Sequence, residues 1–295
     1  MPFRSIPRHI LAFTFVISIA LAVISASIQA DSGRSLVMLL AQQNRLSMIL
    51  GTYDAKRGWL GLEGIDKPAQ PGDDFTIYTM AGERAQVKVT DDYPSTFNQG
   101  PIVWSARTTT WSRDPKEPYA LALPGKSPLA GAAAETIDLQ SAGLAAEISA
   151  YLKKKGLDVP APLITSAYQI DLSEKRPKAT FVTAYSGERD AAKGETENFY
   201  ALALLLERNG DGWQVYPLAE ETSYKPKSQS MSDHKKYYGV LDNYRIIACM
   251  DLDGDGIKDL VLHLAKDDGT EVQIFTFKHR YPKQVLSVFR HHFND

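Results

Sequence analysis

The sequence predicts a mainly β protein with a few helices, of the α+β class. Residues 53–123 alternate short runs rich in β-branched and aromatic residues with turns rich in Pro, Gly and Asp. Residues 163–295 have the same character, with longer apolar runs. Helical spacing of apolar residues is confined to two short segments. We therefore expect a small N-terminal antiparallel β-barrel or sandwich, followed by a second antiparallel β-domain.

The first 30 residues have the layout of a secretory signal peptide. Arg4 and Arg8 make a basic start, and residues 10–26 form an uncharged apolar run. The small residue Ala30 then precedes the first acidic residue, as at a cleavage site. We expect export to the periplasm or the extracellular space, with an uncleaved N-terminal anchor as the alternative. No later apolar run is long enough to span a membrane.

Charge and cysteine content narrow the function classes. Removal of residues 1–30 takes away two basic residues and leaves 31 Lys and Arg against 35 Asp and Glu, a net charge of −4. This weakly acidic balance argues against nucleic acid as a partner. Cys249 is the only cysteine, so an internal disulfide is excluded. Its apolar surroundings favour a buried small side chain over a nucleophile.

The N-terminal module is predicted to span residues 31–125. Residues 35–50 place apolar side chains near helical spacing and Gly51 follows as a stop signal, which predicts a short helix. The β-rich runs come next, with the aromatic residues Trp59, Trp104 and Trp111 among them. These aromatic side chains are either ordinary core or a binding face for sugars or a protein partner.

A linker and a second module follow. Residues 126–136 are rich in Pro, Gly and Ala, which is typical of a linker. The second module, residues 137–295, begins with a predicted helix from about Asp138 to Lys155. The rest is β-rich, and the stretch "RNGDGW" (208–213) favours a tight hairpin turn.

The stretch "MDLDGDGIKDLVL" (250–262) is the strongest candidate for a functional site. Calcium takes six to eight oxygen ligands in a flexible shell. Carboxylates at loop positions 1, 3, 5 and 9, with a backbone carbonyl at 7, can wrap one such ion, and Gly256 allows the sharp turn. The sequence therefore predicts one Ca²⁺ bound by Asp251, Asp253, Asp255, Asp259 and the carbonyl of Ile257. Because this loop alone supplies a nearly complete shell, we expect a structural ion rather than a catalytic one.

The flanks of the loop decide which kind of calcium loop it is. An EF-hand requires Glu at position 12 and a helix on each side, whereas this chain has Leu262 and strand-like flanks. The D-x-D-x-D-G-x-x-D spacing resembles the calcium loops of FG-GAP or VCBS repeats, found in integrin α-chain propellers, where the loop joins two strands of a blade. The resemblance covers about a dozen residues. It implies a propeller-blade-like antiparallel β-domain within 137–295, which is too short for a closed propeller.

A second, degenerate copy of this unit lies 80 residues earlier. Residues 167–187 align with 248–269, and Asp171-Leu172 matches Asp251-Leu252. Where the second copy has its remaining acidic ligands, the first has Ser173, Lys175 and Ala179. The first copy therefore keeps the strands and has lost the acidic loop.

Motifs for catalysis are missing from the sequence. There is no G-x-S-x-G elbow, no H-E-x-x-H and no Gly-rich phosphate loop. We expect an exported, calcium-stabilised, non-catalytic binding or structural protein of the cell envelope, with an envelope protein or a polysaccharide as partner. The alternatives are a secreted hydrolase with a site between the two modules and a subunit of an envelope complex. The ligand and the oligomeric state do not follow from the sequence.

Overall fold

The computed structural model describes most of the chain after residue 35. The described residues are 36–42, 44–62, 65, 69–95, 103–111, 118–125, 134–139, 142–173, 176, 178–186, 198–210, 212–224, 243–266 and 269–291. The predicted signal peptide, residues 1–30, lies outside them, as does most of the predicted linker. Within these ranges no helix is both long and apolar enough to cross a membrane.

The N-terminal part is a six-stranded antiparallel barrel, which confirms the mainly β class. Its strands follow the order β1-β7-β4-β5-β6-β2, and pairing of β1 with β2 closes it. A short seventh strand, β3 (Gly58–Leu60), extends the sheet beyond β2. The barrel strands are β1 (Leu36–Gln42), β2 (Arg45–Asp54), β4 (Asp74–Thr79), β5 (Gly82–Ser95), β6 (Val103–Thr108) and β7 (Ala120–Pro124).

The predicted helix at 35–50 is wrong, because this segment is the β1–β2 hairpin. Met38 and Leu40 point out of the barrel into one apolar cluster, whereas Leu39 and Ala41 point into the barrel core. A strand that is buried on both faces is apolar at every position and loses the two-residue alternation. Such a run cannot be told from a buried helix by periodicity alone.

Two four-stranded antiparallel meanders follow the barrel. The helix-side sheet has the order β12-β11-β10-β9, with the two-residue β8 (Glu135–Thr136) added to β9, and the central sheet has the order β13-β14-β15-β16. The hairpin predicted in 208–213 is confirmed by the pairing of Asn209 with Gly212. The strands are β9 (Ile164–Ile170), β10 (Ala179–Tyr185), β11 (Asn198–Asn209), β12 (Gly212–Tyr224), β13 (Asn243–Met250), β14 (Asp259–Lys266), β15 (Gly269–Thr276) and β16 (Lys283–His291).

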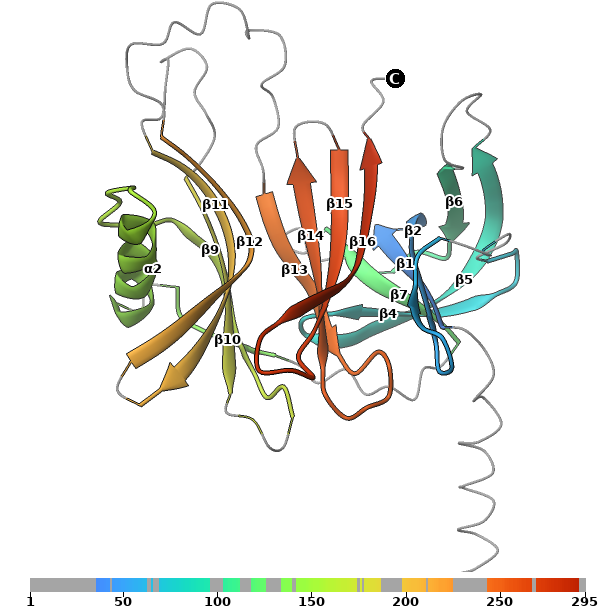
Figure 1. Ribbon diagram of the computed structural model, residues 1–295. Helices are drawn as coiled ribbons and strands as arrows, with labels where there is room; N and C mark the ends of the chain where they lie inside the picture. Colours follow the sequence, from blue (N-terminus) through green and yellow to red (C-terminus); the bar gives the residue numbers. More distant parts are fainter. Residues whose placement is uncertain are drawn as a thin grey trace, which may run out of the picture.

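The helix α2 (Ala142–Lys154) covers the outer face of the helix-side sheet (Figure 1). Leu144, Ile148 and Leu152 recur every four residues and form its buried stripe. The helix begins four residues later than predicted, so Asp138 precedes it in an extended segment. It ends before Gly156, whose φ of +85° is a left-handed conformation that favours glycine.

The central sheet is packed on both faces, between the helix-side sheet and the barrel (Figure 1). Along β14, Leu260 and Leu262 point toward the helix-side sheet, and Val261 points toward the barrel. Phe181 and Phe277 meet edge to face across the first interface, with ring centroids 5.7 Å apart. The central sheet is therefore the middle layer of the described structure.

Candidate metal centre

The aspartate loop joins β13 to β14, as the strand-like flanks predicted. Met250 pairs with Asp259, so residues 251–258 form a loop closed by a strand pair. Gly254 and Gly256 have φ values of +75° and +83°, where a side chain would be strained. These two glycines let the loop turn back on itself.

Three carboxylates of the loop converge. Asp251, Asp253 and Asp259 each offer an oxygen, and these oxygens lie within 4.8 Å of one another. Asp259 is fully buried, and the side chain of Asp253 has no exposed surface. Burial, together with the nearby charge of Asp253, raises the pKa of the Asp259 carboxyl to about 8. Burial also raises the pKa of Asp253.

The two oxygens of Asp259 differ in their contacts. Oδ2 accepts a hydrogen bond from the backbone N–H of Leu252 at 3.1 Å. Oδ1 is buried and makes no hydrogen bond of ordinary geometry with a described residue, although the Thr276 hydroxyl lies close enough to this carboxyl to work against the rise in its pKa. A buried carboxylate oxygen without a partner is costly, and a cation would remove that cost.

Asp251 organises the backbone of the loop. Its Oδ1 accepts the N–H of Gly254 at 2.7 Å and that of Asp255 at 3.1 Å, and its Oδ2 accepts the N–H of Gly256 at 2.8 Å. These bonds hold the turn of the loop around the converging oxygens.

Asp255 and Ile257 lie outside the converging group of side chains. Oδ1 of Asp255 accepts the N–H of Ile257 at 2.8 Å, and its Oδ2 lies 3.1 Å from the ammonium of Lys278. Of the predicted ligands, the structure brings Asp251, Asp253 and Asp259 together. Ligation by Asp255 and by the Ile257 carbonyl stays a prediction.

Lys278 is a residue of this site that the sequence analysis missed. It follows β15, and its ammonium lies 2.6 Å from Oδ2 of Asp253. Burial works to lower the pKa of Lys278, but its hydrogen bonds to Asp253 and Asp255 raise it on balance. Connections one and three of a four-stranded meander lie at the same end of the sheet. The topology of the central sheet therefore places Lys278 beside the aspartate loop.

The degenerate copy packs against the aspartate loop. Ile170 pairs with Ala179 at the same relative place as Met250 with Asp259, so the two loops occupy equivalent positions in their meanders. The N–H of Lys258 donates to the carbonyl of Leu172 at 2.9 Å and links the loops directly. The aspartate loop therefore lies at the junction of the two sheets.

The barrel also reaches this region. Burial raises the pKa of Tyr53, which lies at the end of β2, and the charge of Asp253 adds to the shift. Trp59 meets Tyr53 edge to face at 5.2 Å and packs on the cluster that contains Leu252. Barrel, central sheet and helix-side sheet thus all contribute residues close to the loop.

The donor set suits a hard divalent cation. Carboxylate oxygens are the ligands that calcium prefers, and the lack of imidazole or thiolate donors in the loop disfavours zinc or copper. The converging oxygens of Asp251, Asp253 and Asp259 would hold the ion. Such an ion would supply positive charge to a cluster that Lys278 neutralises only in part.

Other residues singled out in the sequence have structural surroundings. Cys249 is buried with a free thiol, and burial raises the pKa of that thiol. Trp111 fills the barrel core. The side chain of Trp104 lies outside the described residues.

Comparison of the chain with protein-family models, with curated proteins and with solved structures gives no match. The resemblance of the aspartate loop to FG-GAP or VCBS repeats therefore stays a prediction.

Proposed function

We propose that this chain is an exported, non-catalytic binding or structural protein of the cell envelope whose central sheet is stabilised by one Ca²⁺. The observation that carries the proposal is the convergence of the Asp251, Asp253 and Asp259 oxygens within 4.8 Å at a loop between strands. The loop makes contact with the helix-side sheet through Leu172. An ion there would hold the layers in register rather than act on a substrate.

A binding role is favoured over the secreted hydrolase by the lining of one cavity in the described structure. This cavity lies between the helix-side and central sheets, close to where the hydrolase hypothesis places its site. Its described lining residues include the hydroxyls of Thr165, Ser166 and Thr183 but no Asp, Glu, His or Cys. A hydroxyl nucleophile needs an adjacent general base such as His or a carboxylate, and the described lining supplies neither.

The calcium part of the proposal is tested by thermal melting of the chain in calcium and in chelator. At calcium ten times above its dissociation constant the expected stabilisation is about 1.4 kcal/mol. For a chain of this size this corresponds to a rise in Tm of roughly 2–3 °C. Magnesium at the same concentration should give a smaller rise, because it requires tighter, octahedral coordination.

Two variants separate a specific site from a general effect of salt. Asp251→Asn removes one converging carboxylate and should abolish the rise in Tm. Asp171→Asn changes the matching, exposed position of the degenerate copy and should keep the rise. An equal calcium response in wild type and Asp251→Asn, or no response at all, would refute the calcium site.

A further inference from the structure

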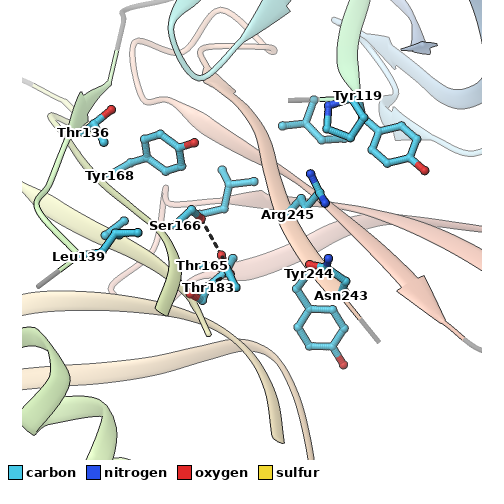
Figure 2. Close-up of a pocket in the computed structure, with 14 residues that line it drawn as sticks. Tyr119, Thr136, Leu139, Thr165, Ser166, Tyr168, Thr183, Asn243, Tyr244 and Arg245 are labelled. Atoms are coloured by element: carbon cyan, nitrogen blue, oxygen red, sulfur yellow. Dashed lines mark hydrogen bonds between the residues drawn. The ribbon is translucent and has the colours of Figure 1, made fainter. Parts of the chain in front are cut away.

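A cavity of about 480 Å³ lies where the helix-side sheet, the central sheet and the barrel meet (Figure 2). It is lined by residues of β8, β9, β10 and β13 and by the segment that leads into β7. Its volume falls within the roughly 300–1,000 Å³ of small-molecule sites. It opens along the first half of β13, whereas the aspartate loop follows the last residue of that strand.

The cavity is bounded by two strand edges. Consecutive residues line it, 165–168 from β9 and 243–247 from β13. Because consecutive side chains of a strand point to opposite faces, a run of this kind means that the strand edge itself faces the cavity. β13 pairs only with β14 among the described strands, so its other edge is open. The β9 edge is partly covered, because Thr136 pairs with Tyr168 and the N–H of Ile137 donates to the carbonyl of Ala167 at 3.0 Å. Backbone groups of β13 therefore border the hollow together with the side chains.

Three hydroxyl groups form a chain on the β9–β10 wall. Oγ1 of Thr183 lies 2.8 Å from Oγ1 of Thr165 and 2.6 Å from Oγ of Ser166. Oγ1 of Thr165 also lies 3.2 Å from the carbonyl oxygen of Thr183. The buried Thr183 is thus the centre of the chain, and Ser166 is the half-buried end of it.

This hydroxyl chain has two donor arrangements, with opposite consequences for a ligand. If Thr165 donates to the Thr183 hydroxyl, Thr183 donates to Ser166, and the Ser166 proton is left for a ligand acceptor. In the second arrangement, Thr165 donates to the Thr183 carbonyl, and the Thr183 hydroxyl donates to Thr165. Ser166 then donates to the Thr183 hydroxyl and keeps its lone pairs for a ligand donor. Since a hydroxyl both donates and accepts, a ligand hydroxyl fits either arrangement.

The remaining walls offer aromatic and cationic groups. Tyr168 from β9 and Arg245 from β13 extend toward the hollow from opposite sides (Figure 2). A tyrosine presents an apolar ring face together with a polar hydroxyl, as a sugar ring presents an apolar face and a hydroxylated rim. Arg245 is the only charged residue among the described lining residues, and it also has a partner within the protein, so the cavity suits a neutral or acidic ligand better than a cation.

We propose that this cavity binds a saccharide of about one to two rings, with Ser166 and Thr183 as its hydrogen-bonding end and Tyr168 as its stacking surface. The assignment gives a ligand class to the binding role proposed above and rests on that role. It is independent of the aspartate loop, which lies beyond the other end of β13.

The test is binding of three probes to the full chain: chitobiose, maltose and galacturonic acid, measured by saturation-transfer NMR and calorimetry. We expect at least one probe to bind at millimolar concentration or below. Ser166→Ala and Thr183→Val should each weaken that binding about five- to tenfold, the loss of one hydrogen bond. Tighter binding of galacturonic acid than of the other two probes would indicate that the ligand is an acidic saccharide whose carboxylate lies near Arg245. Tighter binding of chitobiose or maltose would indicate a neutral saccharide.

Thr180→Val is the matched control, because Thr180 is a buried threonine of the same strand that does not line the cavity. It should leave the affinity unchanged. Failure of all three probes to bind, or equal affinity in wild type and both cavity variants, would overturn the saccharide assignment. Saccharide binding without a calcium effect on melting would refute only the calcium site, and the reverse result would refute only the saccharide site.

Discussion

Replacement of Asp259 by Asn should change stability in opposite directions with and without calcium. Asp259 is fully buried, with one oxygen bonded to the N–H of Leu252 and the other without a hydrogen bond of ordinary geometry among the described residues. The nearby Thr276 hydroxyl offsets only part of the effect of burial on its pKa. Asparagine has nearly the same shape and carries no charge. Without calcium the variant should therefore be more stable than wild type at pH 8, and with calcium it should be less stable.

The size of this effect follows from the pKa of Asp259. Burial and Asp253 raise it to about 8 in the folded protein, against about 3.9 for an unfolded chain. The folded state therefore binds more protons between these two pH values, and the calcium-free protein loses stability as pH rises from about 4 through 8. A shift of about four units corresponds to at most about 5 kcal/mol. Relaxation of the partly exposed loop reduces the expected effect to on the order of 2 kcal/mol.

The assay is urea unfolding of wild type and Asp259→Asn at pH 5 and pH 8, each in chelator and in calcium. Wild type in chelator should be less stable at pH 8 than at pH 5, and the variant should lack most of this difference. Asp171→Asn, at an exposed position, serves as the control for loss of a loop carboxylate. If Asp259→Asn lowers the free energy of unfolding equally under all four conditions, neither a buried charge at Asp259 nor calcium binding by it affects stability, and the prediction is wrong.

Three further predictions concern other residues. Lys278→Met should raise calcium affinity about two- to fivefold in calorimetry, because the ammonium no longer competes for Asp253 and Asp255; an unchanged affinity would contradict this. Gly51→Ala should cost roughly 2 kcal/mol or more in urea unfolding, because φ is +132° and an added Cβ would lie 2.7 Å from Leu286 Cδ2 and from the Leu60 carbonyl oxygen. Gly61→Ala should leave the free energy of unfolding nearly unchanged, because an added Cβ at this position meets no neighbouring atom within 4 Å. The thiol of Cys249 should react with Ellman's reagent only after unfolding, since it is buried and burial raises its pKa; fast reaction of the native protein would show an opening of the central sheet.

Local chemistry made part of this structure predictable. The turn between Asn209 and Gly212 and the end of α2 before Gly156 follow from glycine and turn preferences that act within a few residues. The convergence of Asp251, Asp253 and Asp259 likewise depends on one short loop, so its spacing was sufficient to predict it.

The errors arose where partners distant in sequence decide the outcome. The segment 35–50 has apolar residues near helical spacing because its described strands are buried on two sides, by the barrel interior and by a sheet more than 190 residues later in the chain. Lys278 meets the aspartate loop only because four strands pair in sequence order. That meeting would have been predictable once the meander was assumed, since its first and third connections share an end.

The position of the central sheet sets the order in which this chain can finish folding. It is made from residues 243–291, which are synthesised after the barrel and the helix-side sheet, yet it fills the space between them. Until those residues emerge, both earlier units expose apolar faces that include Leu40 and Leu121 on one side and Phe181 and Leu205 on the other. The barrel and the helix-side sheet can therefore bury these faces only after residues 243–291 have been made. A chain cut short before residue 243 would keep two exposed apolar faces, which makes it prone to aggregation.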